Sequence, residues 1–112
     1  MQIELDFGSL QLDAILDDTP IARQLFAMLP LKIDLTYWGD ELYGDIGQDL
    51  GLHQPKPRVP EGTLGYTNRG NCFCVFFGQQ PAWSVDVLGK LTDDWEALRG
   101  TNFKTLTIRT AD

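Results

Sequence analysis

Short segments in which apolar and polar side chains alternate recur along this chain. Residues 2–7, 10–14 and 31–38 all show the pattern. A period of two residues is typical of a β-strand with one face buried and the other in water. Only Gly8 and Ser9 separate the first two segments, and glycine accepts the positive φ that a type II′ turn requires at its first position. The first two segments therefore predict a β-hairpin.

Further strands are predicted in the second half of the chain. Residues 63–67 and 72–77 form two candidates joined by a short polar turn. The second candidate is apolar on both faces, which favours a central position in the sheet. Residues 85–91 continue as a strand in which Gly89 indicates a bulge or a close backbone approach, and residues 106–108 mark the last strand.

One longer helix is predicted after the hairpin. Thr19 has the side chain of an N-cap, and Pro20 suits the first helical position because its missing N–H would be unpaired there. The apolar residues that follow fall on one helical face until Pro30 ends the pattern. The sequence thus predicts an amphipathic helix of about three turns.

A second, shorter helix is expected over residues 94–99. Asp93 and Glu96 have the spacing of a capping box, and Gly100 follows at the position where a left-handed residue commonly ends a helix.

These elements together predict a mainly β fold, either a barrel or a sandwich, with the longer helix at an open end. The 112 residues have the length of one domain, so residues 1–112 are expected to form one. Residues 47–62 are rich in Gly and Pro and predict a long loop, a kind that is usually functional or mobile. The absence of a signal-peptide pattern and of a long apolar run leads us to expect a soluble, cytoplasmic protein.

The charge balance excludes one class of partner. The formal net charge is −7, and most of the acidic excess lies in residues 1–62. Nucleic-acid binding normally requires a basic stripe, so no nucleic-acid partner is expected. No membrane partner is expected either, because no apolar run is long enough to span a membrane. The acidic group Asp40, Glu41, Asp45 and Asp49 could be a cation site, but a solvated loop is the preferred interpretation.

No pattern of catalytic, metal-ligating or cofactor-binding residues stands out. Cys72 and Cys74 have only His53 as a further ligand candidate, so they are interpreted as small buried apolar side chains and His53 as a surface residue. Phosphate-binding glycine motifs and a nucleophile elbow are absent from the sequence. We therefore predict no catalytic residues, no metal site and no cofactor.

A ligand site is suggested by aromatic and acidic residues next to the long loop. The segment 38–46 combines aromatic rings with a carboxylate and two glycines, and further amphipathic rings occur elsewhere in the chain. Small-ligand and peptide sites are lined in this way. The candidate ligand-binding residues are Glu41, Tyr43, Tyr66 and Trp83. The alternative is that these rings only fill the barrel and its rims.

Several segments, taken in order, resemble the small prokaryotic cyclophilin-like proteins. They are residues 20–31, 41–44, 62–66, 70–78 and 85–90, and the resemblance extends over nearly the whole chain. It implies a closed, eight-stranded cyclophilin-like β-barrel with the helix over one end. Thr63 stands where that family often has Asp. The Phe-His-Arg-like, Gln-Gly-Gly-Asp and Phe-x-Met-Ala runs of true cyclophilins are missing, so the resemblance does not carry over prolyl isomerase activity.

Three functions follow as hypotheses. The first is a non-enzymatic module that binds a small molecule or peptide near the four candidate residues. The second is a diverged peptidyl-prolyl cis-trans isomerase, and the third is a role in assembly.

Overall fold

The alternating segments become the strands of a single antiparallel sheet. The computed structural model describes residues 1–111, and within them the chain forms nine strands, one α-helix and one 3₁₀ helix. In chain order the elements are β1 (Gln2–Asp6), β2 (Gln11–Leu16), α1 (Pro20–Ala27), β3 (Leu31–Asp34), β4 (Thr36–Tyr37), β5 (Glu41–Asp45), β6 (Thr63–Thr67), β7 (Cys72–Phe76), β8 (Asp86–Leu91), η1 (Trp95–Leu98) and β9 (Thr105–Thr110).

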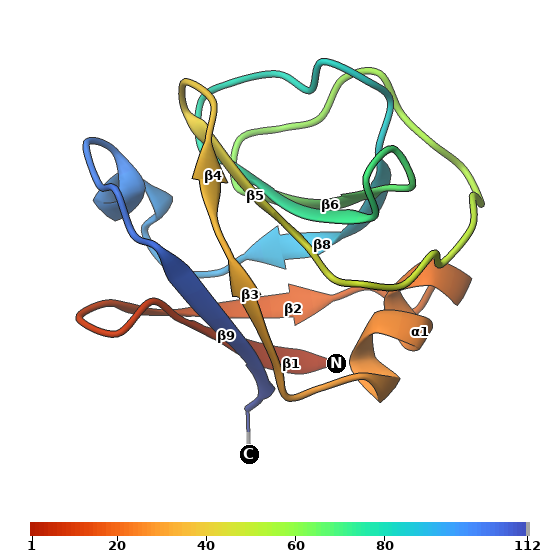
Figure 1. The fold of residues 1–112 in the computed structure, drawn as a ribbon, viewed down its shortest axis with the longest axis horizontal. Helices are drawn as coiled ribbons and strands as arrows, with labels where there is room; N and C mark the ends of the chain where they lie inside the picture. Colours follow the sequence, from red (N-terminus) through yellow and green to blue (C-terminus); the bar gives the residue numbers. More distant parts are fainter. Residues whose placement is uncertain (112) are drawn as a thin grey trace.

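The sheet curls into a nearly closed barrel. Its order is β3-β9-β1-β2-β8-β6-β7-β5-β4, so its two end strands are successive parts of one segment (Figure 1). Only Leu35 separates β3 from β4, and its backbone N–H donates to the carbonyl of Lys104 at 2.9 Å. β3 pairs with β9, and β4 pairs with β5. The strand count is therefore nine instead of the expected eight, because the predicted strand 31–38 is interrupted at Leu35.

The first hairpin is confirmed. β1 and β2 pair in an antiparallel register from Gln2 opposite Ile15 to Asp6 opposite Gln11. Gly8 has a φ of 100°, a backbone conformation that is strained for residues with a side chain. The N–H of Phe7 donates to the carbonyl of Leu10 across the turn. The two-residue turn thus sets the register of the whole hairpin.

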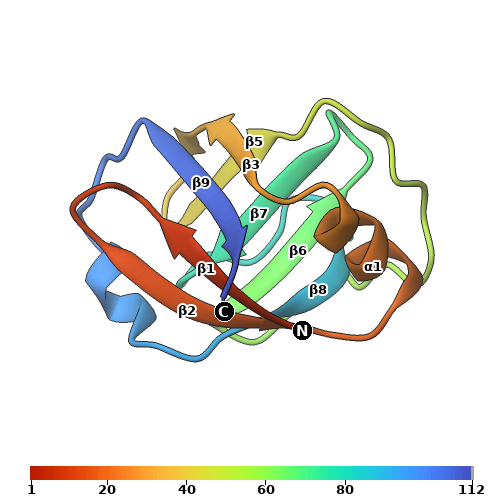
Figure 2. The same cartoon turned by 90° about the horizontal axis from the view of Figure 1, so that it is seen from below.

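The longer helix is also confirmed with the N-terminal cap that the sequence predicts, but its eight residues form about two turns instead of three and end at Ala27. The side chain of Thr19 accepts a hydrogen bond from the N–H of Ala22 at 3.3 Å, and Pro20 is the first helical residue. The helix buries Ile21, Ala22 and Leu25, and it lies at one end of the barrel (Figure 2).

The predicted capping box of the short helix is wrong. Asp94, not Asp93, is the N-cap of η1, and its carboxylate accepts from the N–H of Glu96 at 3.0 Å. The carboxylate of Asp93 accepts instead from the N–H of Asp13, 80 residues away. A tertiary contact to β2 has therefore replaced the local cap. Gly100 has a φ of 74°, as expected for the residue that follows the helix.

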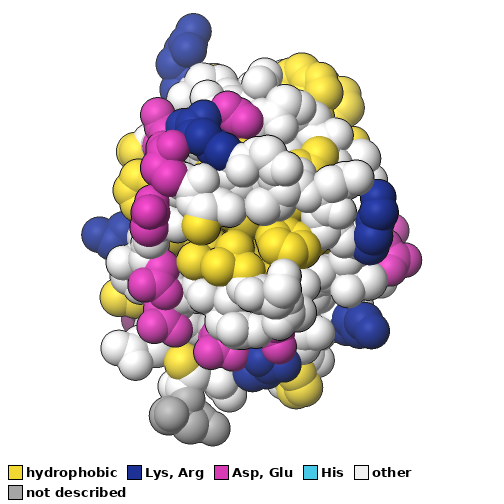
Figure 3. All heavy atoms as spheres, turned by 90° about the vertical axis from the view of Figure 1, so that its left-hand side faces the viewer, with side chains coloured by type: hydrophobic (Ala, Val, Ile, Leu, Met, Phe, Trp, Pro, Cys, Tyr) yellow, Lys and Arg dark blue, Asp and Glu magenta, His cyan; other side chains and the backbone are white. Residues whose placement is uncertain are grey.

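The inward faces of the strands form the main core. Ile3, Leu5, Leu64, Phe73 and Val75 are fully buried there. At the end of the barrel away from α1, Phe7 stacks on Phe103 with ring centroids 5.1 Å apart. Figure 3 shows the left-hand side of Figure 1, where hydrophobic side chains lie in a hollow with acidic side chains along one side.

The long loop between β5 and β6 is held against the barrel. Its residues Leu50 and Val59 are buried. The carboxylate of Asp86, in β8, accepts from the N–H groups of His53 and Gln54 at 3.2 and 2.7 Å. The side chain of Gln80 both donates to and accepts from the backbone of Val59. The chain therefore packs this segment through side-chain bonds to its backbone and not through strand pairing, apart from one bridge between Lys56 and Val85.

Gly89 makes the close approach that the sequence suggests. A Cβ atom at this position would collide with the carbonyl oxygen of Ile15 in β2. Among the described residues, no helix has the length and apolar character needed to cross a membrane.

Candidate functional site

The candidate site lies on the outside of the barrel, over β5 and β7. Alternate residues of β7 point into the main core, so Cys72, Cys74 and Phe76 face outward. On the neighbouring strand β5, Glu41 pairs with Phe76 and Tyr43 pairs with Cys74. Because directly paired residues share a face of the sheet, these side chains gather at one place on the outer surface.

The surface there is hollowed into a cavity of about 270 Å³, which we call the outer pocket. Phe76 at its base is buried, whereas Trp38 and Trp83 are 47% and 54% exposed. The whole lining consists of Trp38, Glu41, Tyr43, Thr67, Arg69, Cys72, Cys74, Phe76, Pro81, Ala82, Trp83 and Val85. The pocket is thus mainly apolar and aromatic, with a small number of polar groups, as in known ligand sites.

Glu41 is the buried polar group of this pocket. Its side chain belongs to a residue that is only 7% exposed, and it forms no ion pair within residues 1–111. Burial raises the pKa of Glu41 from 4.5 to about 7, and a hydrogen bond with the thiol of Cys74 opposes the rise. The Cys74 thiol also donates to the carbonyl oxygen of Cys72, which lies 3.7 Å from its sulfur. Its one proton therefore has two acceptors, this carbonyl and the carboxyl group of Glu41. The carboxyl group is therefore poised between its neutral and ionised forms near neutral pH.

The two cysteines of the pocket are free thiols and lie on one face, as the sequence indicates. Cys74 is buried and Cys72 is half-buried. Burial raises the pKa of both thiols, and the nearby carboxylates Glu41 and, for Cys72, Asp45 raise it further. A thiol must ionise to act as a nucleophile or metal ligand, so this environment favours the interpretation as small apolar side chains. No group of three or more metal-ligating side chains occurs among residues 1–111.

Arg69 and Trp83 form the rim of the pocket. The guanidinium carbon of Arg69 lies 5.1 Å from the centroid of the Trp83 ring, which is the distance of a cation–π contact. The backbone N–H of Arg69 donates to the hydroxyl of Thr67 at 3.1 Å, which fixes the turn between β6 and β7. Arg69 forms no ion pair within the described part of the chain.

The structure brings together three of the four residues that the sequence singled out. Glu41, Tyr43 and Trp83 line the outer pocket, but Tyr66 does not. Tyr66 points into the core, where its hydroxyl accepts from the N–H of Leu50 at 2.8 Å and donates to Asn71 at 3.0 Å. The sequence carries a signal for this difference, since Tyr66 shares its strand face with the apolar Leu64.

None of the remaining lining residues was predicted from the sequence as ligand-binding. Trp38, Arg69, Cys72 and Cys74 were not among the predicted ligand-binding residues, although all four line the pocket. Because β7 is apolar on both faces, its sequence does not show which face is the outer one.

The four acidic residues that lie close together in the sequence, Asp40, Glu41, Asp45 and Asp49, have different roles in the structure. Asp40 pairs with Arg99 at 2.6 Å, whereas Asp45 and Asp49 each accept from a backbone N–H two residues further on. Only Glu41 enters the pocket. The alternative of a cation site at this group is therefore not favoured by the geometry, and His53 is exposed as expected.

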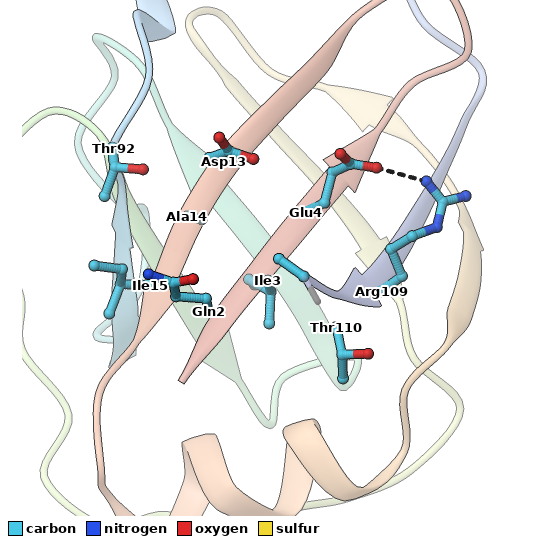
Figure 4. A pocket seen from close by; sticks show the side chains of 10 residues that line it. Gln2, Ile3, Glu4, Asp13, Ala14, Ile15, Thr92, Arg109 and Thr110 are labelled. Atoms are coloured by element: carbon cyan, nitrogen blue, oxygen red, sulfur yellow. Dashed lines mark hydrogen bonds and ion pairs between the residues drawn. The ribbon is translucent and has the colours of Figure 1, made fainter.

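A second hollow crosses the outer face of β1, β2 and β9 (Figure 4). It is larger, about 690 Å³. Its arginine is already paired, because Arg109 contacts Glu4 at 2.8 Å and Asp6, which lies outside the lining, at 2.9 Å. We therefore take the smaller outer pocket, with its buried carboxyl group, as the candidate site.

The barrel and its single capping helix define a cyclophilin-type fold. A family model described as Cyclophilin-like matches residues 1–108, and the chain belongs to this family. None of the curated proteins compared with the chain matches it significantly.

Two solved structures are similar to this one. A hypothetical protein from Archaeoglobus fulgidus, known from a solution structure, matches with a TM-score of 0.84 and 25% identity over 99% of this chain and 95% of that chain. McbB, solved in complex with tryptophan, matches with a TM-score of 0.79 and 17% identity. That match covers 96% of this chain and 44% of McbB, so the chain spans less than half of McbB and the likeness concerns the fold.

Proposed function

We propose that this protein is a binding module whose outer pocket takes a small molecule with an apolar body and one polar group directed at Glu41. The observation that carries the proposal is the carboxyl group of Glu41, a residue only 7% exposed, which lines an aromatic cavity and forms no ion pair within residues 1–111. Ionising a buried carboxyl group is costly unless a charged or strong hydrogen-bond partner is present, and a polar ligand group can supply such a partner.

The dimensions and composition of the pocket support a small ligand. A cavity of about 270 Å³ is close to the lower end of the range for ligand sites, so a fragment-sized molecule or one side chain of a peptide fits it. Trp38 and Trp83 are the two most exposed aromatic residues that line the pocket, and they offer ring surface to the body of the ligand.

A ligand screen by thermal shift tests the proposal, because a bound ligand raises the apparent stability by mass action. Compounds that raise the melting temperature of the wild type should lose this effect in Glu41→Ala and Tyr43→Ala. The variant Gln2→Ala, in the second hollow, is the control and should keep the full effect. The proposal fails if no compound in a broad library shifts the melting temperature, or if the shifts depend on Gln2 instead.

Prolyl isomerisation remains the alternative function. One observation favours it: a guanidinium group, Arg69, lies beside apolar surface, and such a group can stabilise a twisted amide. A protease-coupled assay on Ala-Pro peptides separates the two functions. If the protein is only a binding module, isomerisation in its presence should proceed as slowly as without it, over tens of seconds or longer. A faster, Arg69-dependent rate would favour the isomerase.

A further inference from the structure

The outer pocket holds a buried carboxyl group that forms no ion pair with a basic side chain of the described residues. Glu41 is buried, and no lysine, arginine or histidine forms an ion pair with it in the described residues. Its polar neighbour is the thiol of Cys74, a weak donor. Ionising such a carboxyl group becomes favourable when a cation is placed beside it.

The same pocket offers aromatic rings, which attract cations through their faces. Trp38, Tyr43 and Trp83 all line it. The ring of Trp83 already contacts a cationic group, because the guanidinium of Arg69 lies over it. The contact demonstrates that a positive group can reach this ring, and organic ammonium ions are recognised by such combinations of rings and a carboxylate.

We infer that the ligand of the outer pocket carries an organic ammonium group, and that this group binds between the carboxylate of Glu41 and the aromatic rings of the pocket. The inference rests on the proposed function and adds the chemical class of the ligand.

An anionic ligand held by Arg69 is the competing assignment. Arg69 is exposed, so water solvates its charge and a missing partner costs little. Glu41 is buried, so its missing partner costs more. The net charge of −7 also favours the approach of cations over anions. These three facts favour the ammonium ion.

Three probes of matched shape test the inference: 2-phenylethylamine, 2-phenylethanol and phenylacetate. Binding is measured by calorimetry, and the indole N–H signals of the tryptophans in NMR spectra locate it. We expect the amine to bind about tenfold more tightly than the alcohol at a pH above the pKa of Glu41, with phenylacetate weakest. Glu41→Gln should remove the preference for the amine and leave the binding of the alcohol nearly unchanged.

The pH dependence provides a second readout. A primary amine stays protonated to above about pH 9, so changes near neutrality report on the protein. The titratable and charged groups that line the pocket with Glu41 are Tyr43 of β5, Cys72 and Cys74 of β7, and Arg69 of the β6–β7 turn. Burial raises the thiol pKa values, which keeps both cysteines neutral in this range. The affinity for the amine should therefore rise as Glu41 ionises, whereas that for the alcohol should not, and Glu41→Gln should abolish the rise.

The results separate the inference from the proposed function. Tightest binding of phenylacetate, lost in Arg69→Gln, would overturn the ammonium assignment and leave the binding function standing. Equal binding of amine and alcohol would also overturn it. If none of the three probes perturbs the tryptophan signals, the inference fails, and the library screen decides the proposed function separately.

Discussion

At the scale of single residues, Glu41 is the most unusual group of the molecule. It occupies an outward position of β5, yet it is only 7% exposed in the pocket that Trp38 and Trp83 also line. Most buried carboxylates in proteins are paired with a cation or bonded to several donors. The folded protein therefore carries a cost at Glu41 that grows when the carboxyl group ionises.

The substitution Glu41→Gln should stabilise the free protein at neutral and higher pH. The pKa of Glu41 is about 7 in the fold against 4.5 in the unfolded chain, so the folded state binds the extra proton between these values. Stability then falls as pH rises through this window, and the loss is complete above about pH 7. The two pKa values correspond to at most about 3.4 kcal/mol, and water that screens the partly accessible carboxyl group lowers this. We therefore expect Glu41→Gln to recover about 2 kcal/mol there and to change little below pH 4.5.

Urea unfolding of both proteins across this pH range measures the effect. Glu61→Gln, which removes an exposed carboxylate, is the control and should keep the pH profile of the wild type. A constant stability difference between wild type and Glu41→Gln at every pH would contradict the assignment.

At the scale of elements, the long loop depends on side chains that lie far away in the sequence. Asp86 is 3% exposed and bonds to two successive N–H groups of the loop, while the hydroxyl of Tyr66 bonds to a third. Since residues 47–62 contain no regular strand or helix, these bonds replace backbone pairing as the source of order.

The substitution Asp86→Asn should loosen this loop selectively. An amide nitrogen would take the place of one acceptor oxygen and face an N–H donor, which costs about 1–3 kcal/mol locally. Hydrogen exchange at His53 and Gln54 should accelerate, while exchange in β1 and β2 should not. Asp49→Asn is the matched control, because the carboxylate of Asp49 accepts from the N–H of Gly51 and makes no bond to His53 or Gln54. Unchanged exchange at His53 and Gln54 would disprove the role of Asp86.

The elements with strong local signals were predictable, and those set by distant contacts were not. The turn at Gly8 and the caps at Thr19 and Pro20 depend on nearby residues, so the sequence predicts them correctly. Asp93 was wrongly assigned as a cap because its true partner, Asp13, is remote in sequence. The sequence analysis predicts a ligand site and no strand over residues 38–46. The structure has strand β5 there, in which Glu41 points outward and Leu42 points inward.

The candidate site was predicted in part for the same reason. Aromatic and acidic residues identified Glu41, Tyr43 and Trp83. The contribution of β7 depends on its register beside β5, where Cys74 lies opposite Tyr43. Such a register arises from the closure of the whole sheet, and no local pattern encodes it.

At the scale of the whole molecule, the barrel closes where β5 meets the bend between β3 and β4. Gly44 lies at this closure, and a Cβ atom there would collide with the carbonyl oxygen of Asp34 and lie 2.9 Å from Cδ1 of Ile33. A glycine is needed because the two backbones approach closely.

The substitution Gly44→Ala should therefore weaken the closed sheet by about 1–3 kcal/mol, as overpacking of an interior typically does. Urea unfolding measures the loss. In a double-mutant cycle, Ile33→Val should relieve part of it, because valine lacks the Cδ1 atom that the new methyl group meets. Strictly additive effects of the two substitutions would show that the closure does not depend on this contact.

The location of the outer pocket on the convex side of the sheet separates two selective pressures on the chain. Residues that point inward form the core, whereas under the proposed function their immediate neighbours along the same strands would determine which ligand binds. Evolution can therefore exchange the outward residues of β5 and β7 with little disturbance to internal packing. A scaffold of this kind can acquire new specificities while its architecture stays constant, which is consistent with the low sequence identity among the structures that share it.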